Sequence, residues 1–243
     1  MSQKGYLVVF SLPTHPSFST SHDLFNKWYN EVHIPDILRL GRPDGFTSAF
    51  RYARAGFDPS DPSTASTTNK HDFEVTYPKN EKWLYLAMYP VPDVAKASRP
   101  DSGLYKAPLV HEMLPSGSGK GTGGGGNAME VAKWELGFWE VVGEGEREGE
   151  RESDSSKDTD VILVPVDSSD IPGYDVPGAH PSALLDYSRK GWEGSDPVGS
   201  RLLKYTAPAY NCCDGTGIKQ YLAVTLKPEF KTVKYKLYKK FGV

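Results

Sequence analysis

The sequence predicts an α+β protein in which one arrangement of strands and helices is used twice. Three observations favour this fold: the order of the expected elements, short echoes between the two halves, and a charged segment between them. The expected order is β-α-β-β-α-β in the first half and β-α-β-β-α in the second. The echoes relate 50–55 (FRYARA) to 203–208 (LKYTAP), and 83–90 (WLYLAMYP) to 219–226 (KQYLAVTL).

Each half has the ferredoxin-like topology, in which two helices cover one face of an antiparallel sheet. The other sheet face must be covered as well. We therefore expect two ferredoxin-like βαββαβ units, fused in tandem into a pseudo-dimeric α+β barrel with the helices outside. The first unit is expected over 1–142 and the second over 161–243. The segment 143–160 between them is charged, lacks apolar residues and is expected to be a flexible linker.

The first half opens with a strand predicted over 6–11, where β-branched and aromatic residues dominate. A helix is predicted from near His22 to Leu40, because apolar residues recur at helical spacing and Gly41 follows. Weaker helices are predicted over 94–98 and 104–110, strands over 45–55, 83–89 and 134–142, and loops over 56–81 and 115–127.

The second half is predicted to contain strands over 161–166, 200–210 and 220–227, and a helix over 181–192. A last helix is expected to begin at Pro228, since proline is favoured at the first helical position. Its apolar residues would then share one helical face: Phe230, Val233, Leu237, Tyr238 and Phe241.

Composition and charge exclude several functional classes. The chain has 243 residues and a net charge of −3, which makes nucleic acid an unexpected partner. The apolar run over 6–10 is too short for a signal peptide or a membrane span, so a cytoplasmic protein without a membrane partner is expected. The two cysteines, Cys212 and Cys213, are adjacent, which rules out a disulfide framework. No two histidines stand at i, i+4 spacing with a carboxylate partner, so no metal site is expected unless the fold gathers distant residues.

The segment Trp28–Pro35 (WYNEVHIP) is the strongest candidate for a functional site. Proline removes a backbone donor and disfavours helical dihedrals in the residue before it, so the helix is expected to break near His33. A histidine held there can face a cavity and act as an acid or base, because its reference pKa is about 6.5. The alternative is a structural histidine that ties the helix end to a neighbour.

Aromatic residues of the first half supply the rest of the predicted site. Tyr52 and Tyr85 are expected to join His33 as catalytic residues, by donating hydrogen bonds to a developing enolate or phenolate oxygen. Arg51 is expected to hold a carboxylate, although strand alternation would point it away from Tyr52. Many of these aromatics are expected to fill the core instead. The expected substrate-binding residues are Trp28, Tyr29, Tyr6, Arg51, Tyr89, Trp134 and Phe138.

The Trp28–Pro35 segment, followed by Gly45-Phe46 and Arg51-Tyr52, resembles the EthD-like group of the dimeric α+β barrel superfamily, and in particular its fungal members with two fused units. The resemblance covers most of 5–142, whereas the helix expected over 182–192 lacks the His-x-Pro motif. It implies one working cavity in the first unit and a degenerate second unit. It also implies a cofactor-independent lyase or isomerase of fungal secondary metabolism, which decarboxylates, dehydrates or cyclises an aromatic or polyketide-type metabolite by acid–base catalysis.

Two alternatives stay open within the same superfamily. One is a haem protein or cofactor-free oxygenase, in which His33, His111 or His180 would be the axial ligand of a haem. The other is a non-catalytic ligand-binding module, in which side chains fill the pocket and His33 is inaccessible. The expected assembly is a monomer (a pseudo-dimer) or a homodimer.

Overall fold

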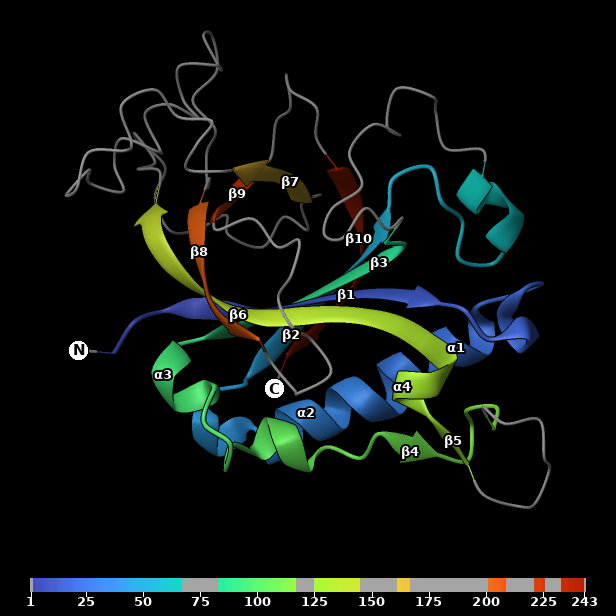
Figure 1. The fold of residues 1–243 in the computed structure, drawn as a ribbon, viewed down its shortest axis with the longest axis horizontal. Helices are drawn as coiled ribbons and strands as arrows, with labels where there is room; N and C mark the ends of the chain where they lie inside the picture. The colour runs from blue at the N-terminus through green and yellow to red at the C-terminus, as the bar shows by residue number, and fades with distance from the viewer. Residues whose placement is uncertain are drawn as a thin grey trace, which may run out of the picture.

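Eight antiparallel strands close into a barrel in the computed structural model, which describes residues 2–66, 83–116, 125–144, 161–166, 201–208, 221–225 and 233–242 (Figure 1). The order around the barrel is β1-β3-β2-β10-β7-β9-β8-β6. The chain is therefore of the α+β class, as the sequence predicts. The strands are β1 (Gly5–Pro13), β2 (Ser48–Arg54), β3 (Tyr85–Val91), β6 (Ala132–Glu144), β7 (Val161–Val166), β8 (Arg201–Pro208), β9 (Tyr221–Thr225) and β10 (Val233–Gly242).

The same strand order occurs in each half of the barrel. The first four barrel strands along the chain are arranged β6-β1-β3-β2, and the last four are arranged β10-β7-β9-β8. In both halves the fourth strand lies beside the first, and the third separates the first from the second. The halves join where β6 pairs with β8 and where β10 pairs with β2. Both of these junctions contain a register shift, which is typical of β-bulges.

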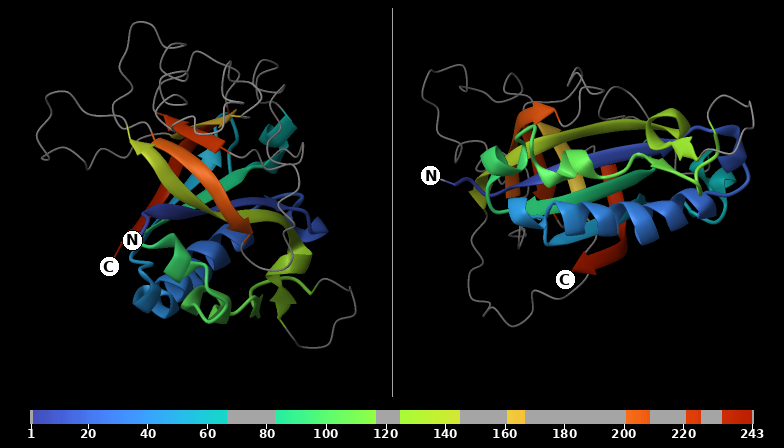
Figure 2. Two further views of the ribbon diagram at one scale, coloured as in Figure 1. Left: turned by 60° about the vertical axis from the view of Figure 1, so that its left-hand side comes forward. Right: turned by 90° about the horizontal axis from the view of Figure 1, so that it is seen from below.

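Helices cover the outer face of the first half. One continuous helix is made of α1 (Asp23–Trp28), a π-helical turn (Tyr29–His33) and α2 (Ile34–Leu40), and it runs along the sheet (Figure 2, right). The remaining elements are α3 (Val94–Ala97), α4 (Ala128–Val131), the paired β4 (Val110–His111) and β5 (Gly126–Asn127), and 3₁₀ turns at Pro16–Phe18, Arg42–Asp44, Pro62–Ser66 and Gly103–Lys106.

The π-helical turn corrects the expectation that the helix breaks before Pro35. The helix continues, because the backbone N–H of Ile34 bonds to the carbonyl of Tyr29 in the wider π pattern. Pro35 has no N–H to donate and sits in the first turn of α2, where none is needed. Single π turns of this kind occur often at functional sites. His33 is the last residue of this π turn. The turn that accommodates Pro35 therefore also determines where His33 lies on the helix.

The sheet has two differently packed faces. On β3, Tyr85, Ala87 and Tyr89 belong to the large core beneath the helices, and Leu86 and Met88 belong to a second core inside the barrel. Strand alternation predicts one face with Trp83, Tyr85, Ala87 and Tyr89 and another with Leu84, Leu86 and Met88, and the prediction is correct within β3. It is wrong for the two residues that precede β3, because Trp83 packs with the second core and Leu84 with the core beneath the helices. The long helix and the strands therefore enclose one apolar layer, and the barrel interior is another.

The C-terminal helix expected from Pro228 is wrong over its described part, since 233–242 form strand β10. Apolar and lysine residues alternate from Val233 to Leu237, which is the pattern of a strand. A register shift then occurs between Leu237 and Lys239, so Tyr238 is an extra residue in the strand. This bulge moves Phe241 onto the same face as Ala49, and the two-residue period is lost in a way that imitates helical spacing.

Several other predicted elements differ from the structure at their ends or lie outside the described residues. The helix expected over 104–110 is only a 3₁₀ turn followed by β4, and the end of the glycine-rich segment forms β5. Residues 143 and 144 still belong to β6. The helix expected over 181–192 and the rest of the expected linker lie outside the described residues. Among the helices that the structure describes, none is long and apolar enough to cross a membrane.

Candidate functional site

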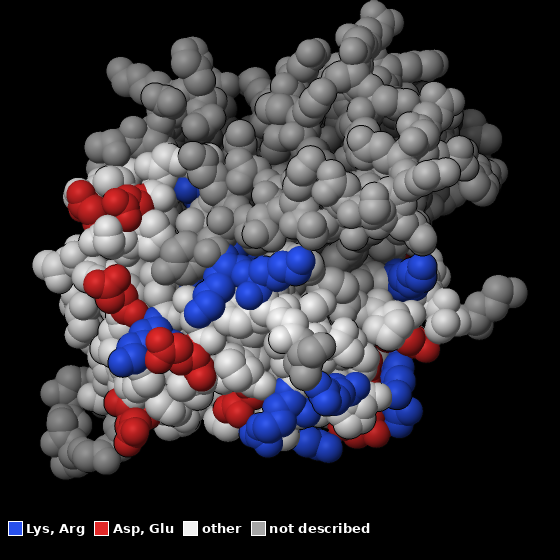
Figure 3. Space-filling view, turned by 180° about the vertical axis from the view of Figure 1, so that it is seen from behind, with Lys and Arg blue, Asp and Glu red and all other residues white. Residues whose placement is uncertain are grey.

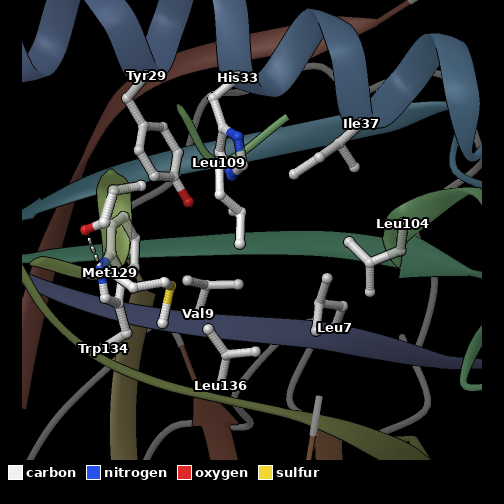
Figure 4. Close-up of a pocket in the computed structure, with 11 residues that line it drawn as sticks. Leu7, Val9, Tyr29, His33, Ile37, Leu104, Leu109, Met129, Trp134 and Leu136 are labelled. Carbon is white, nitrogen blue, oxygen red and sulfur yellow. Dashed lines mark hydrogen bonds between the residues drawn. The ribbon is translucent and has the colours of Figure 1, made fainter. Parts of the chain in front are cut away.

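A small cavity lies between the long helix and the sheet, beside His33 (Figure 4). Tyr29, His33 and Ile37 reach down from the helix toward side chains of β1 and β6. The cavity has a volume of about 20 Å³, which is room for about one water molecule. Its other lining residues are Leu7, Val9, Leu104, Leu109, Ala128, Met129, Trp134 and Leu136. The wall is almost entirely apolar, so the few polar atoms in it determine what it can bind.

His33 supplies the most informative of these polar atoms. The residue is 8% exposed. Its ring stacks on Trp28 with centroids 4.7 Å apart and meets the edge of Tyr29 at 5.2 Å. Nδ1 is buried and has no hydrogen-bond partner among the described residues. The backbone carbonyl of Pro108 accepts a hydrogen bond from the ring, and this bond leaves Nδ1 with an unused lone pair.

Burial lowers the pKa of His33 to about 4. The nearby Asp36 carboxylate and the Pro108 carbonyl favour the charged ring, whereas Arg51 disfavours it. Desolvation is the largest of these effects because the imidazolium loses its hydration. At neutral pH the imidazole is therefore uncharged, with a basic nitrogen available.

Tyr29 is the polar neighbour of His33 in the cavity wall. Its burial raises the pKa of the phenol, and the Arg51 guanidinium opposes this shift in part. A side-chain hydrogen bond with Tyr89 lowers this pKa as well. The phenol therefore keeps its proton at neutral pH, and it can donate a hydrogen bond to a ligand in place of Tyr89. The Tyr29 ring is held from two sides, by the stacked ring of Trp134 at 5.9 Å and by Arg51, whose guanidinium carbon lies 4.3 Å from the ring centroid.

Arg51 organises a buried polar network next to the cavity. Its side chain is fully buried and donates to Oδ1 of Asn26 at 2.7 Å and to Oδ1 of Asn30 at 2.8 Å. It also lies over the rings of Tyr29 and Tyr85, at 4.3 and 4.5 Å from their centroids. Amide oxygens and aromatic faces offset part of the cost of burying a cation. Arg51 is thus engaged by the protein itself and does not line the cavity.

The hydroxyl of Tyr85 belongs to the same network. Nδ2 of Asn26 donates to it at 2.9 Å, and Nδ1 of His22 lies 3.1 Å away. Burial, assisted by the charge of Arg51, lowers the pKa of His22 to about 4, so its uncharged ring can accept a hydrogen bond from the Tyr85 hydroxyl. Tyr85 therefore lies on the same side of the sheet as His33, but its hydroxyl is already bonded to His22 and Asn26.

The structure brings together only part of the predicted site. Tyr29, His33 and Trp134 line the cavity. Most of the others share the helix-side core without reaching the cavity: Trp28, Tyr85, Tyr89 and Phe138. Tyr6 and Tyr52 lie apart from these residues, because they belong to the core inside the barrel, across the sheet from His33. Tyr52 pairs with Leu86, whereas Arg51 pairs with Ala87, so alternation separates the two neighbours as expected.

Sequence reasoning missed His22, Asn26 and Asn30. Asn26 and Asn30 lie on the same side of the helix as Tyr29 and His33, at the three- and four-residue spacing of one helical face. Two asparagines among aromatic residues on a buried helix face indicate that a polar side chain packs against them. The sequence therefore contained a signal for the Arg51 network. His22 carried no such signal, because its partner Tyr85 is distant in sequence.

In this structure the cavity beside His33, at about 20 Å³, has no room for a porphyrin. Nδ1 of His111 accepts a hydrogen bond from the backbone N–H of Met113, and His180 lies outside the described residues. Within the ranges that the structure describes, no group of three or more His, Cys, Asp or Glu side chains is placed to hold a metal ion.

No family model matches the sequence, and no curated protein matches it significantly. The resemblance to the EthD-like group therefore stays a prediction from the Trp28–Pro35 segment.

Proposed function

We propose that the cavity beside His33 binds a small, largely apolar molecule and that the protein catalyses proton transfer on it without a cofactor. The single observation that carries the proposal is the buried Nδ1 of His33, which has no partner among the described residues and belongs to a residue of the cavity wall. Protein structures rarely leave a buried polar atom unpaired without a reason. A ligand with an acidic proton satisfies this nitrogen.

The proposed mechanism uses two side chains. Nδ1 of His33 takes a proton from carbon next to a carbonyl group, and the electron pair moves onto the carbonyl oxygen. The neutral phenol of Tyr29 donates a hydrogen bond to the resulting enolate. Asp36 favours the imidazolium that forms. Proton return to a different atom gives isomerisation, and loss of hydroxide from the neighbouring carbon gives dehydration. In decarboxylation, the loss of CO₂ from a β-keto acid forms the enolate directly, and the enolate then takes up a proton. These reactions are the lyase or isomerase chemistry expected for an aromatic or polyketide-type metabolite.

The cavity must widen for such a molecule to enter. Leu104 and Leu109 come from the connection between β3 and β6, and Met129 belongs to α4. None of the three belongs to the barrel strands, so they can shift without breaking the sheet. Met129 has three rotatable bonds and adapts easily to a new shape. Movement of these side chains is the step that the proposal requires.

We also propose that the barrel consists of two tandem ferredoxin-like units, of which the first carries the site. The recurring strand order of the two halves supports this reading. So does the position of His33 on the helix that covers the first half. Membership of the EthD-like group and a cytoplasmic location are further parts of this proposal.

Hydrogen–deuterium exchange of a ketone tests the catalytic proposal. The purified protein would be incubated in D₂O with 2-tetralone, whose protons next to the carbonyl are acidic, and their loss followed by NMR. General-base catalysis contributes about 10²–10⁴-fold, so His33→Gln should lower the exchange rate at least about 100-fold. Tyr29→Phe should lower it less. The control His15→Gln removes an imidazole that bonds to Ser17 outside the cavity and should exchange at the wild-type rate. Equal exchange by wild type and His33→Gln would refute the proposal.

The small size of the cavity favours a second candidate, a non-catalytic module in which this region is simply core. Enlarging the cavity separates the two. Met129→Ala should accelerate exchange of 2-tetralone if the cavity is a site that opens. In a closed core, the same substitution only lowers stability, by about 2–3 kcal/mol, and exchange stays at the level of the solvent reaction.

A further inference from the structure

A second concave site lies on the outside of the molecule, between α2 and the end of β10. The groove is open and encloses about 630 Å³. The view from below shows β10 running past α2 toward the C-terminus (Figure 2, right). The groove shares no residue with the His33 cavity. Its lining residues are Pro35, Leu38, Arg39, Arg42, Lys240, Phe241 and Gly242.

Three of these residues carry positive charge. Asp36 is the only carboxylate that pairs with any of them among the described residues, through an Arg39–Asp36 contact of 2.7 Å. That pair is exposed on the Arg39 side and therefore weak. Arg42 and Lys240 are exposed and make no ion pair within the described ranges. Seen from behind, Lys and Arg side chains gather at the centre and along the lower edge of the molecule (Figure 3).

The floor of the groove is apolar, and the bulge in β10 helps to form it. Because Tyr238 is an extra residue, Phe241 shares a face with Ala49 and packs against the core beneath the helices. Leu38 of α2 is buried in the same core. Lys240 instead pairs with Phe50 and lies 5.7 Å from its ring centroid. Phe241 therefore contributes an aromatic side chain to the floor of the groove, and Lys240 stands at its rim on the opposite face of the strand.

We propose that this groove binds an organic anion with an apolar body: a carboxylate, sulfonate or phosphate attached to an aromatic or aliphatic group. The apolar part would lie on Leu38 and Phe241, where its burial is favourable. The anionic group would lie between Arg42 and Lys240, which make no ion pair within the described ranges. Lys240 would turn away from the Phe50 ring to make a charge-assisted hydrogen bond with the anion. The volume suits a ligand of the usual small-molecule size. This site is additional to the proposed catalytic cavity and does not depend on it.

A pair of fluorescent probes tests the charge requirement. 1-Anilinonaphthalene-8-sulfonate has an aromatic body and a sulfonate, and N-phenyl-1-naphthylamine is nearly the same molecule without the anion. Arg42→Gln/Lys240→Gln should weaken binding of the sulfonate roughly tenfold and leave binding of the neutral probe unchanged. Lys4→Gln/Lys27→Gln is the matched control, since it removes two exposed cations outside the groove and should change neither affinity.

Gly242 allows a second, independent variant. A Cβ added at Gly242 meets nothing within 4 Å, so side chains fit there without disturbing the fold. Gly242→Glu places a carboxylate at the rim and should weaken sulfonate binding as strongly as the double variant. Gly242→Ala should bind like wild type. Equal sulfonate affinity in wild type, Arg42→Gln/Lys240→Gln and Gly242→Glu would overturn the proposal.

Vesicles distinguish a free anion from a lipid headgroup. Co-sedimentation with phosphatidylserine vesicles should show no binding that depends on Arg42 and Lys240 at physiological ionic strength. If the double variant loses vesicle binding but binds both probes with wild-type affinity, the groove binds a membrane surface. The small-molecule proposal is then wrong.

Discussion

Two buried histidines of one helix have the same acidity but different surroundings. His22 precedes the first turn of α1 and His33 ends the π turn, and burial lowers the pKa of each to about 4. Nδ1 of His22 lies 3.1 Å from the Tyr85 hydroxyl, whereas Nδ1 of His33 has no partner in the described part of the chain. The comparison teaches that a shifted pKa alone does not identify a functional histidine. An unused lone pair next to a cavity is the additional evidence.

Replacing Arg51 should have the largest effect and should act mainly on the His22 side. Arg51→Met keeps the volume but leaves the amide oxygens of Asn26 and Asn30 without their donor, which we expect to cost about 3 kcal/mol of unfolding free energy. The pKa of His22 should rise more than that of His33, because Asn26 links Arg51 to the Tyr85 hydroxyl beside His22. Urea unfolding and NMR titration of the imidazoles measure both effects. Equal shifts would break the comparison.

Acidification should destabilise the protein through both histidines. Each folded pKa of about 4 is lower than the reference value of 6.5, so the unfolded chain binds protons more readily between these values. Stability is therefore fully present above pH 6.5 and is lost as the pH falls toward 4. From pH 7 to pH 5 we expect a loss of about 2 kcal/mol for each histidine.

Single-histidine variants separate the two contributions to this pH dependence. Urea unfolding at both pH values should show His22→Gln and His33→Gln each losing about half of the pH effect. A variant that keeps the full wild-type effect would mean that its histidine is not held uncharged in the folded protein.

Tyr85→Phe should have a smaller effect that sharpens the contrast. The change leaves His22 Nδ1 and Asn26 Nδ2 without the hydroxyl, and we expect a cost of about 1–2 kcal/mol. Proton transfer at His33 should be unaffected, because Tyr85 does not line the cavity. Thermal unfolding and the ketone exchange assay provide the two readouts. Loss of exchange at unchanged stability would restore Tyr85 to the catalytic role first expected for it.

The sequence predicts strands better than it predicts what their side chains face. The alternation of β3 is visible because the tyrosines fall on one face and the larger aliphatic residues Leu86 and Met88 on the other, and the structure follows it from Tyr85 to Tyr89. On β2 the same rule separates Arg51 from Tyr52, but it cannot say which of them faces the helix. Aromaticity favoured Tyr52 as the site residue, whereas the helix side holds the arginine. Only the tertiary partners Asn26 and Asn30 decide this.

The error at β10 has a local cause. Its alternating segment from Val233 to Leu237 is a clear strand pattern, but Pro228 and the residues around Tyr238 suggested a helix when read together. A bulge inserts one residue, and one residue changes a period of two into spacings that fit a helix. The location of a bulge depends on the neighbouring strands β2 and β7, which a single segment of sequence does not reveal.

The pairing of β10 between β2 and β7 also governs how the chain folds. During synthesis, β2 emerges early, while the strand that pairs with its free edge is made only after most of the other described elements. Until then the nascent chain exposes an unpaired edge, which invites pairing with other chains. Contacts between such distant segments form slowly, because a long loop must be closed first. The barrel therefore closes late in folding. Until then, a chaperone would bind the protein as an open sheet with an unpaired edge.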